Sequence, residues 1–595
     1  MAEPGRVRQV GGEMYSWTDW DPERGPRIPG GTALLRLMSE LATGRSAVLV
    51  AGPHDPALLR ALIRTGAAVS CLVRAVPDAE RIAAEFPDVT VWCGVVSKVD
   101  HGGPFDLIIA ADGLDRLAST EGDQQSPDDL LHGLAGLLAP RGVLALTHPN
   151  LLGLQHLVEL EPGRQYRSDT AWYPVSEHDD LRPASLAELR ARMRAHGLEP
   201  AWGYGAFPAA HRPDVLVADR VTGDTGSPLR APLAAALFAA LTDAYAGTAV
   251  LQDPRPLLER ALRVGAVATL APRWLVLAHP ADAEGVAVPR HDLVVGHEDG
   301  YVYEIAATDR RLRLSVLAPA TAGRQRGALR GVADPGPVAD LAPGRVFEEQ
   351  LLGLCARHDL VGLRAALAGY VSWVQDHAVD GRVSGPVALA GTYDLVATDA
   401  GFWPMPARWE PIDAVPVDVV VARALWGFAA RLITMNRPHP WDLTASAAEL
   451  TVGLAATAGR TLRDGDLDAA LDLEAAVRAA EEDLTPGEAA ERRAALAEVR
   501  TETAGVDLRG YRELADARWR EEYDVTHLRE LMEWTEQTIR GRDRALSLLD
   551  QEMQLYRGTK TARLVQFIKI AYRRARYDLN ELSSKVRRTR GRPAE

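Results

Sequence analysis

Five short apolar runs within residues 46–150 constrain the fold more than any other feature of the chain. Each run spans at most six residues and is rich in Val, Leu and Ile. Such runs are too short for helices and are typical of strands that are covered on both faces. The runs are Ala47–Ala51, Val69–Val73, Val89–Cys93, Phe105–Ala110 and Val143–Thr147.

Segments with helical periodicity lie between these runs. Leucines and an isoleucine at 58, 59, 62 and 63 form one apolar helical face, and leucines between 130 and 138 form another. The second face is stopped by Pro140 and Gly142. Alternating strands and helices of this size predict a doubly wound parallel sheet. Ligands of such sheets bind beyond the carboxyl ends of the strands, near the switch point after the first strand.

Several sequence motifs follow the predicted order of strands and turns. They are Val48-Leu49-Val50-Ala51-Gly52, Gly66-Ala67-Ala68-Val69, Phe105-Asp106-Leu107-Ile108-Ile109 and Leu137-Leu138-Ala139-Pro140-Arg141-Gly142-Val143-Leu144. This stretch resembles class I S-adenosylmethionine (SAM)-dependent methyltransferases. Residues 150–154 and 185–189 and Phe207-Pro208 are similar to a narrower group, the large bacterial methyltransferases found with surface-glycan assembly. That group carries extra C-terminal regions.

The resemblance implies SAM as the cofactor. The candidate cofactor-binding residues are Gly52, His54, Asp55, Asp78, Glu80 and Ala110. Two positions depart from the family pattern. Gly52 is the single glycine left in a turn where several are usual, and Arg74 stands where an acid normally binds the ribose hydroxyls. A guanidinium cannot accept those hydrogen bonds, so Asp78 or Glu80 would have to do so.

A polar loop at residues 166–180 contains the candidate catalytic residues. Methyl transfer to a hydroxyl needs a positioned base, and His or Asp is the usual choice. His178 or Asp179 would act as that base, and Asn150 and Tyr173 would orient the acceptor. The alternative is a solvated surface loop. No metal site is expected, because the histidines have no carboxylate or cysteine at ligand spacing.

Length and composition limit the class of protein. A chain of 595 residues is expected to form two to four domains. The net charge of −14 argues against a general nucleic-acid binder. Three cysteines without CxxC spacing, the lack of an apolar signal core and the lack of an 18-residue apolar run favour the cytoplasm.

The composition changes along the chain predict the domain boundaries. We expect an N-terminal segment over residues 1–31 and a Rossmann-like methyltransferase domain over 32–220. Two α+β regions should follow, over 221–345 and 346–465. Residues 466–595 should form a long helical region with a coiled-coil seam, through which the chain could form a homo-oligomer. The fold class is therefore α/β, followed by α+β and helical parts.

The last helical segment is strongly basic. Residues 560–592 contain eleven Lys or Arg and two acids, which gives this segment a net charge of +9. Since the whole chain has a net charge of −14, the other residues carry −23. Apolar residues recur every three or four positions. A basic amphipathic helix is typical of peripheral contact with a membrane surface, here the inner face of the plasma membrane. A helix packed on the acidic body of the same protein is the alternative.

Two functions remain open from the sequence. The first is a SAM-dependent methyltransferase that O-methylates a sugar or glycan-lipid intermediate. The second is a non-catalytic, methyltransferase-like scaffold that recruits partners. The altered first turn and Arg74 favour the scaffold, whereas the polar loop at 166–180 favours the enzyme. The acceptor rests on the family resemblance alone.

Overall fold

The structure is a computed structural model, and it describes most of the chain. The described residues are 7–14, 18–20, 28–99, 103–119, 125–159, 182–223, 226–245, 250–308, 311–332, 344–399, 401–442, 444–463, 465–500, parts of 532–553, and 560–589. The chain divides into two compact units, Met1–Glu513 and Leu514–Glu595. Each unit is described by itself below.

The first unit contains a twelve-stranded mixed sheet in the order β1-β4-β3-β2-β5-β6-β9-β7-β8-β10-β11-β12. The strands are β1 Val7–Gly11, β2 Ala47–Ala51, β3 Ala68–Val73, β4 Thr90–Gly94, β5 Phe105–Ala110, β6 Leu138–Pro149, β7 Leu198–Ala209, β8 Arg212–Ala218, β9 Arg273–Pro280, β10 Leu293–Gly296, β11 Val302–Thr308 and β12 Arg311–Ala318.

The N-terminal half of this sheet confirms the predicted doubly wound fold. Strands β2 to β6 pair in parallel. Strands β2 to β5 each begin within one residue of a predicted apolar run, and β6 contains the fifth run. Strand β2 lies between β3 and β5, so the chain reverses its direction of winding there. This is the switch point at which doubly wound sheets bind ligands.

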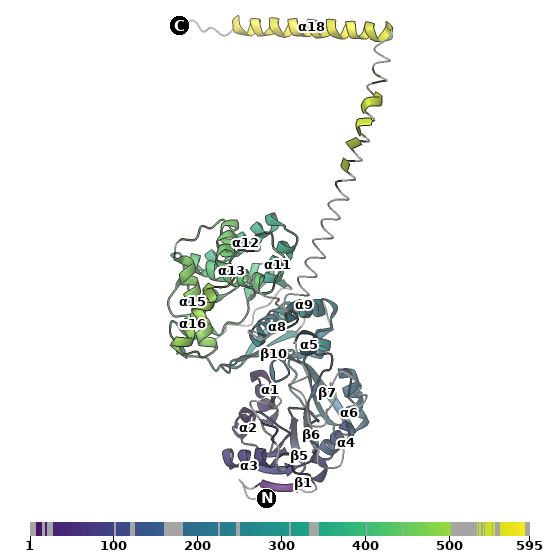
Figure 1. Cartoon of the computed structure of the whole chain (residues 1–595), viewed down its shortest axis with the longest axis vertical. Helices are drawn as coiled ribbons and strands as arrows, with labels where there is room; N and C mark the ends of the chain where they lie inside the picture. Colours follow the sequence, from purple (N-terminus) through teal and green to yellow (C-terminus); the bar gives the residue numbers. More distant parts are fainter. Residues whose placement is uncertain are drawn as a thin grey trace. The chain divides into compact units, whose positions relative to one another are not determined.

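Helices cover both faces of the sheet. They are α1 Thr32–Ala42, α2 Pro56–Ile63, α3 Val76–Glu85, α4 Pro127–Gly136, α5 Leu154–Val158, α6 Leu186–Ala195, α7 Asp219–Thr222, α8 Arg230–Ala244, α9 Pro254–Val264 and α10 Val267–Leu270. Alternate residues of β2 enter different cores: Val48 and Val50 pack with α1, α2 and α3, whereas Leu49 packs with α4 and α6. Figure 1 shows these two helical layers on opposite sides of the strands.

The sheet continues past the boundary predicted at residue 220. Strand β9 lies between β6 and β7 and runs antiparallel to both, and β10, β11 and β12 extend the sheet beyond β8. Residues from the expected middle region therefore complete the sheet of the predicted Rossmann-like domain. The hairpin predicted around Glu298-Asp299-Gly300 is confirmed as β10 and β11. The local pattern predicted these strands but not their long-range pairing.

Residues 344–499 build a second core around a long apolar helix. The helices are α11 Phe347–Ala356, α12 Leu360–Asp376, α13 Val417–Thr434, α14 Ala447–Thr457, α15 Asp466–Glu481 and α16 Pro486–Ala497. Three short sheets join them, made of β13 Gln325–Arg326, β14 Leu329–Gly331, β15 Gly344–Val346, β16 Ala378–Val379, β17 Arg382–Val383, β18 Leu395–Thr398, β19 Gly401–Pro404, β20 Trp409–Pro411 and β21 Val415–Pro416. Helix α13 is buried along most of its length, as its apolar sequence predicts.

Two local patterns in this region mislead. Leucines 351, 354, 363 and 367 predict a single helix over residues 347–374, but it is broken between α11 and α12, where His358 takes a left-handed conformation (φ 54°). The apolar residues at 387–396 predict a strand that is joined to the next one through Asp399-Ala400-Gly401. The two strands pair there as β18 and β19, but β18 begins only at Leu395, and Pro386–Leu389 forms a short 3-10 turn.

The second unit contains helix α18, Lys560–Thr589, which confirms the predicted helix in the basic segment. Its apolar side chains are exposed, including Leu564, Phe567, Ile568 and Leu579 at 60–79%. Of the predicted coiled-coil seam, Leu546, Leu549 and Met553 are described and are also exposed. None of the described helices is both long and apolar enough to cross a membrane.

Candidate functional site

The turn after β2 is closed by the side chains of the chain itself. Gly52 has a left-handed conformation (φ 84°), which residues with a side chain rarely adopt. A Cβ atom there would lie 3.2 Å from Leu117, so this leucine already covers the turn. His54 is fully buried with its Nδ1 atom 2.9 Å from the Gly52 carbonyl oxygen. Burial lowers the pKa of His54 to about 4, so the ring is neutral.

The position after β3 holds a buried ion pair. The Arg74 guanidinium donates from two nitrogens to the Asp19 carboxylate at 2.6 and 2.8 Å, and a third nitrogen donates to the Ala118 carbonyl. Both side chains of the pair are at most 4% exposed. Asp19 belongs to the N-terminal segment. It therefore brings a carboxylate to the end of β3, where the sequence has Arg74 instead of an acid.

A second carboxylate lies beside this pair. The two oxygens of Asp78 accept hydrogen bonds from the Thr18 hydroxyl (2.5 Å) and the Asp19 backbone N–H (2.8 Å). Burial raises the pKa of Asp78 above its ordinary value, and these two hydrogen bonds oppose the shift. We call residues 18–20 the N-terminal strap. The strap places its own Asp19 on Arg74 and also bonds to Asp78, the second acid near the end of β3.

The predicted cofactor residues separate into two groups. Gly52, Asp78 and Ala110 lie buried near the switch point. His54 bonds to the Gly52 carbonyl, and Asp55 caps α2 by accepting the Ala57 N–H at 2.7 Å. Glu80 is exposed on α3.

The predicted catalytic residues His178 and Asp179 lie outside the described residues, as does Tyr173. The amide of Asn150, which we expected to orient an acceptor, is bonded within the chain. Its amide nitrogen donates to the carbonyls of Thr269 and Ala271, and its carbonyl oxygen accepts the Leu152 N–H. These bonds use both donors of the amide. Asn150 therefore joins the end of β6 to the segment before β9.

The groups around the switch point fit SAM in chemistry but are already engaged. Asp19 and Asp78 offer the carboxylates that a ribose needs, and Gly52 offers the close backbone approach. However, Asp19 is paired with Arg74, and Asp78 already accepts two hydrogen bonds from the strap. A ribose bound at Asp78 would have to replace those two donors. Sequence reasoning identified Asp78 and the altered Arg74 position but missed Asp19, because the pair spans 55 residues.

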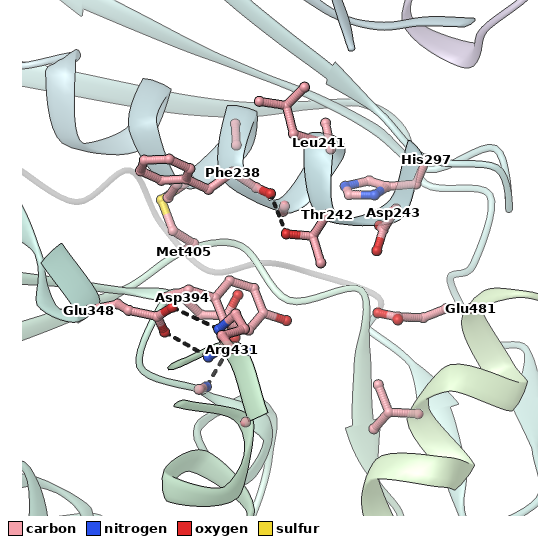
Figure 2. A pocket seen from close by; sticks show the side chains of 18 of the residues that line it. Phe238, Leu241, Thr242, Asp243, His297, Glu348, Asp394, Met405, Arg431 and Glu481 are labelled. Atoms are coloured by element: carbon pink, nitrogen blue, oxygen red, sulfur yellow. Dashed lines mark hydrogen bonds and ion pairs between the residues drawn. The ribbon is translucent and has the colours of Figure 1, made fainter. Parts of the chain in front are cut away.

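A large cavity lies at another part of the first unit. Its volume is about 1120 Å³, and its walls come from α8, from the ends of β8 and β10, and from residues 346–499. Figure 2 shows Phe238 of α8 facing a wall that carries Glu348, Asp394 and Arg431. His297, Asp243 and Glu481 lie together elsewhere in the same cavity.

The cavity and the switch point lie at the same edge of the sheet. The start of β8 and the end of β10 share the edge at which the parallel strands end, and β8 is five strands from β2 in the sheet order. The segment before α1 contacts both places: a Cβ at Gly30 would lie 2.8 Å from the Asp55 carboxylate, the Gly30 N–H donates to the His211 carbonyl at 2.9 Å, and the Thr32 N–H donates to Asp214 of the cavity wall at 2.8 Å.

Asp394 is an unusual residue of the cavity wall. It accepts the Gly391 N–H at 3.0 Å, and no ion pair with it occurs among the described residues. Burial raises its pKa to about 7, although Arg423 and Arg431 oppose the shift. Elsewhere in the described part of the chain, no group of His, Cys, Asp and Glu is arranged to hold a metal ion.

Comparisons with known proteins were made for the whole chain. Neither a family model nor a curated protein matches it. Similar solved structures include the CcbJ methyltransferase from Streptomyces caelestis, with 15% identity over 44% of this chain and 94% of that one (TM-score 0.25). A SAM-dependent methyltransferase from Archaeoglobus fulgidus has 12% identity over 42% and 91% (TM-score 0.26).

A third is the 1,6-didemethyltoxoflavin-N1-methyltransferase from Burkholderia thailandensis, solved with bound S-adenosylhomocysteine (SAH), with 13% identity over 42% and 77% (TM-score 0.22). Values this low carry no argument about cofactor or substrate. The mixed sheet described above is consistent with a Rossmann-like methyltransferase domain.

Asp394 predicts a pH-dependent stability. A carboxyl whose pKa is higher in the folded than in the unfolded state binds more protons when folded, so it lowers stability as the pH rises from about 4 to about 7. Asp394→Asn keeps an acceptor for the Gly391 N–H and cannot ionise. We expect this variant to unfold at a higher temperature than the parent at about pH 8 and at a similar temperature at about pH 4. Equal differences at both pH values would contradict this reasoning.

Proposed function

We propose that the chain is a SAM-dependent methyltransferase whose cofactor binds at the switch point between β2 and β5. One observation carries the proposal: Asp78 accepts a hydroxyl and an N–H from the strap, one on each oxygen. A pair of ribose hydroxyls would offer the same carboxylate two donors. The Thr18 hydroxyl and the Asp19 N–H would therefore take the place of the ribose hydroxyls until SAM displaces them.

The residues of the chain would hold the cofactor through these same groups. Asp78 would accept the ribose hydroxyls after the Thr18 hydroxyl and the Asp19 N–H have released it. The Asp19 side chain would stay on Arg74 and neutralise it, and the Gly52 backbone would allow a close approach. Bound SAM would supply an electrophilic methyl group on a sulfonium. The burial of Arg74, His54 and Asp19 keeps water out of this region, which strengthens the polar contacts of the site.

The strap makes a direct test possible with SAH, the demethylated product. Thr18→Ala removes the hydroxyl that competes for Asp78, so we expect tighter SAH binding than in the parent protein. Asp78→Asn removes the charged acceptor, so we expect weaker binding by about tenfold or more, since hydrogen bonds to charged groups contribute about 1.5–3 kcal/mol. Calorimetric titration of the folded full-length proteins measures both effects.

Thr43→Ala is the matched control, because Thr43 bonds only within its own helix end. It should leave SAH binding unchanged. If the folded parent protein and Thr18→Ala both fail to bind SAH at high micromolar concentration, the proposal is wrong.

That failure would support the second candidate function, a non-catalytic scaffold. The buried Arg74–Asp19 pair specifically favours it. Removing one partner of a buried pair typically costs about 3–5 kcal/mol, so the strap is held in place by a strong interaction. In a scaffold, this ion pair would hold the strap on Asp78 permanently, so that no cofactor could bind there.

For the methyl acceptor, we propose a hydroxyl of a sugar or glycan-lipid intermediate. This choice rests on the resemblance of residues 150–154 and 185–189 to the glycan-assembly group. His178 or Asp179 would accept the hydroxyl proton during transfer. We expect His178→Ala to lower turnover by about 10²- to 10⁴-fold, with little change in SAH affinity. Unchanged turnover would exclude His178 as the base.

We also propose that α18 binds the anionic inner face of the plasma membrane. Between residues 563 and 583 its described side chains include five cations and two acids, and its apolar residues are exposed. An apolar stripe flanked by cations fits the surface of an anionic bilayer. Each cation near such a surface contributes about 1 kcal/mol. Self-association through the C-terminal helices is the competing use of the same stripe.

Flotation with liposomes tests this proposal. We expect the full-length protein to float with anionic vesicles and not with zwitterionic ones. The triple change Arg573→Gln, Arg574→Gln and Arg576→Gln should weaken partitioning by about 3 kcal/mol, or roughly a hundredfold. Equal flotation of the full-length protein and of residues 1–559 would contradict it, and sedimentation as a dimer that does not float would favour self-association.

A further inference from the structure

The cavity beside α8 is large enough for an organic ligand. Its volume of about 1120 Å³ is at the upper end of small-molecule pockets, which are typically about 300–1,000 Å³. One wall is apolar and comes mainly from α8, with Phe238 on the side of the space and Met405 close to Phe238 (Figure 2). This wall suits the hydrocarbon body of a ligand.

The remaining walls carry an excess of negative charge. The lining contains eight arginines, no lysine and eleven Asp or Glu residues. Every one of the eight arginines forms an ion pair with a carboxylate. Of the eleven acids, Glu349 and Asp394 take part in none of the ion pairs among the described residues. The surplus charge of the cavity therefore lies on carboxylates.

The arginines nearest to Asp394 are committed to other acids. Arg431 donates from two nitrogens to Glu348, each at 2.7 Å, and Arg423 pairs with Glu474 at 2.8 Å. Paired guanidiniums do not attract an anionic ligand, because the anion would have to displace a carboxylate. An unpaired carboxylate in a low-dielectric wall instead attracts a cation.

From this arrangement we infer that the cavity binds a small organic amine with an apolar body, whose ammonium group pairs with Asp394. The ammonium donates to the carboxylate oxygens, and the apolar body packs against Phe238 and Met405. The ligand neutralises one of the two carboxylates of the lining that take part in no ion pair among the described residues. The inference does not rest on the proposed methyl transfer, since it uses none of the residues assigned to SAM.

Other residues of the wall support a ligand that is also polar. Trp409 and Arg423 both line the cavity, are at most 7% exposed, and keep a buried donor nitrogen (Nε1 and Nε) for which the described residues provide no acceptor. Buried donors normally have a partner. A hydroxyl or carbonyl oxygen on the ligand, or a water molecule bound with it, would provide one.

Three probes of the same shape test the sign of the charge. They are 2-naphthylmethylamine, 2-naphthalenemethanol and 2-naphthoic acid, titrated into the full-length protein at about pH 8, where Asp394 and the amine are both charged. We expect the amine to bind at least tenfold more tightly than the alcohol, and the acid to bind most weakly. Tighter binding of the acid, or equal binding of all three, would overturn the inference.

Two substitutions locate the binding site. Asp394→Asn should weaken the amine at least tenfold and leave the alcohol within about twofold. Glu298→Gln is the matched control, because it removes one charge from an exposed acid of the same lining, and it should change amine binding by less than twofold. Ala239→Leu, which adds volume to the α8 wall, should weaken both probes. Amine binding that survives Asp394→Asn unchanged would overturn the assignment.

Discussion

The ion pair between Arg74 and Asp19 determines what the switch point of the sheet can do. A guanidinium buried at the end of β3 requires a carboxylate, because an unpaired buried charge is very costly. Asp19 supplies it from the N-terminal strap, and the strap then brings Thr18 and the Asp19 N–H onto Asp78. Arg74, at a position where class I methyltransferases carry an acid, thus connects the strap to Asp78. If SAM binds at Asp78 as proposed, its binding and the position of the strap are linked equilibria.

The same sheet edge carries a second and chemically different region. Near the end of β3 the charges of Arg74 and Asp19 are paired, whereas the cavity near the start of β8 contains two carboxylates, Glu349 and Asp394, that take part in no ion pair among the described residues. The extension of the sheet by β8 to β12 creates this region, and residues 346–499 enclose it. Two ligand sites on one sheet would allow a small amine to act at a distance from methyl transfer. Any coupling between them would have to pass through the shared sheet and α1, which packs on β8 and β10.

The sequence predicted the parallel strands accurately because buried strands have a distinctive local composition. Ala47–Ala51 and Phe105–Ala110 match the structure at both ends. Contacts between distant residues were not predictable in this way: β9 inserts between β6 and β7, and Asp19 pairs with Arg74 across 55 positions. Candidate site residues were recognised by type and spacing, which could not reveal that Asn150 and His54 already bond to the backbone. The cavity had no sequence signal, since its lining comes from segments spread over residues 208–499.

The central claim is that the strap and the cofactor compete for Asp78. Amide hydrogen exchange at Asp19 tests it most directly, because this N–H is bonded to Asp78 in the described conformation. The account predicts protection of the Asp19 amide without ligand and loss of that protection in saturating SAH, while amides within β2 stay protected. Binding of SAH with the Asp19 amide fully protected would contradict the account, and so would a failure of SAH to bind at all.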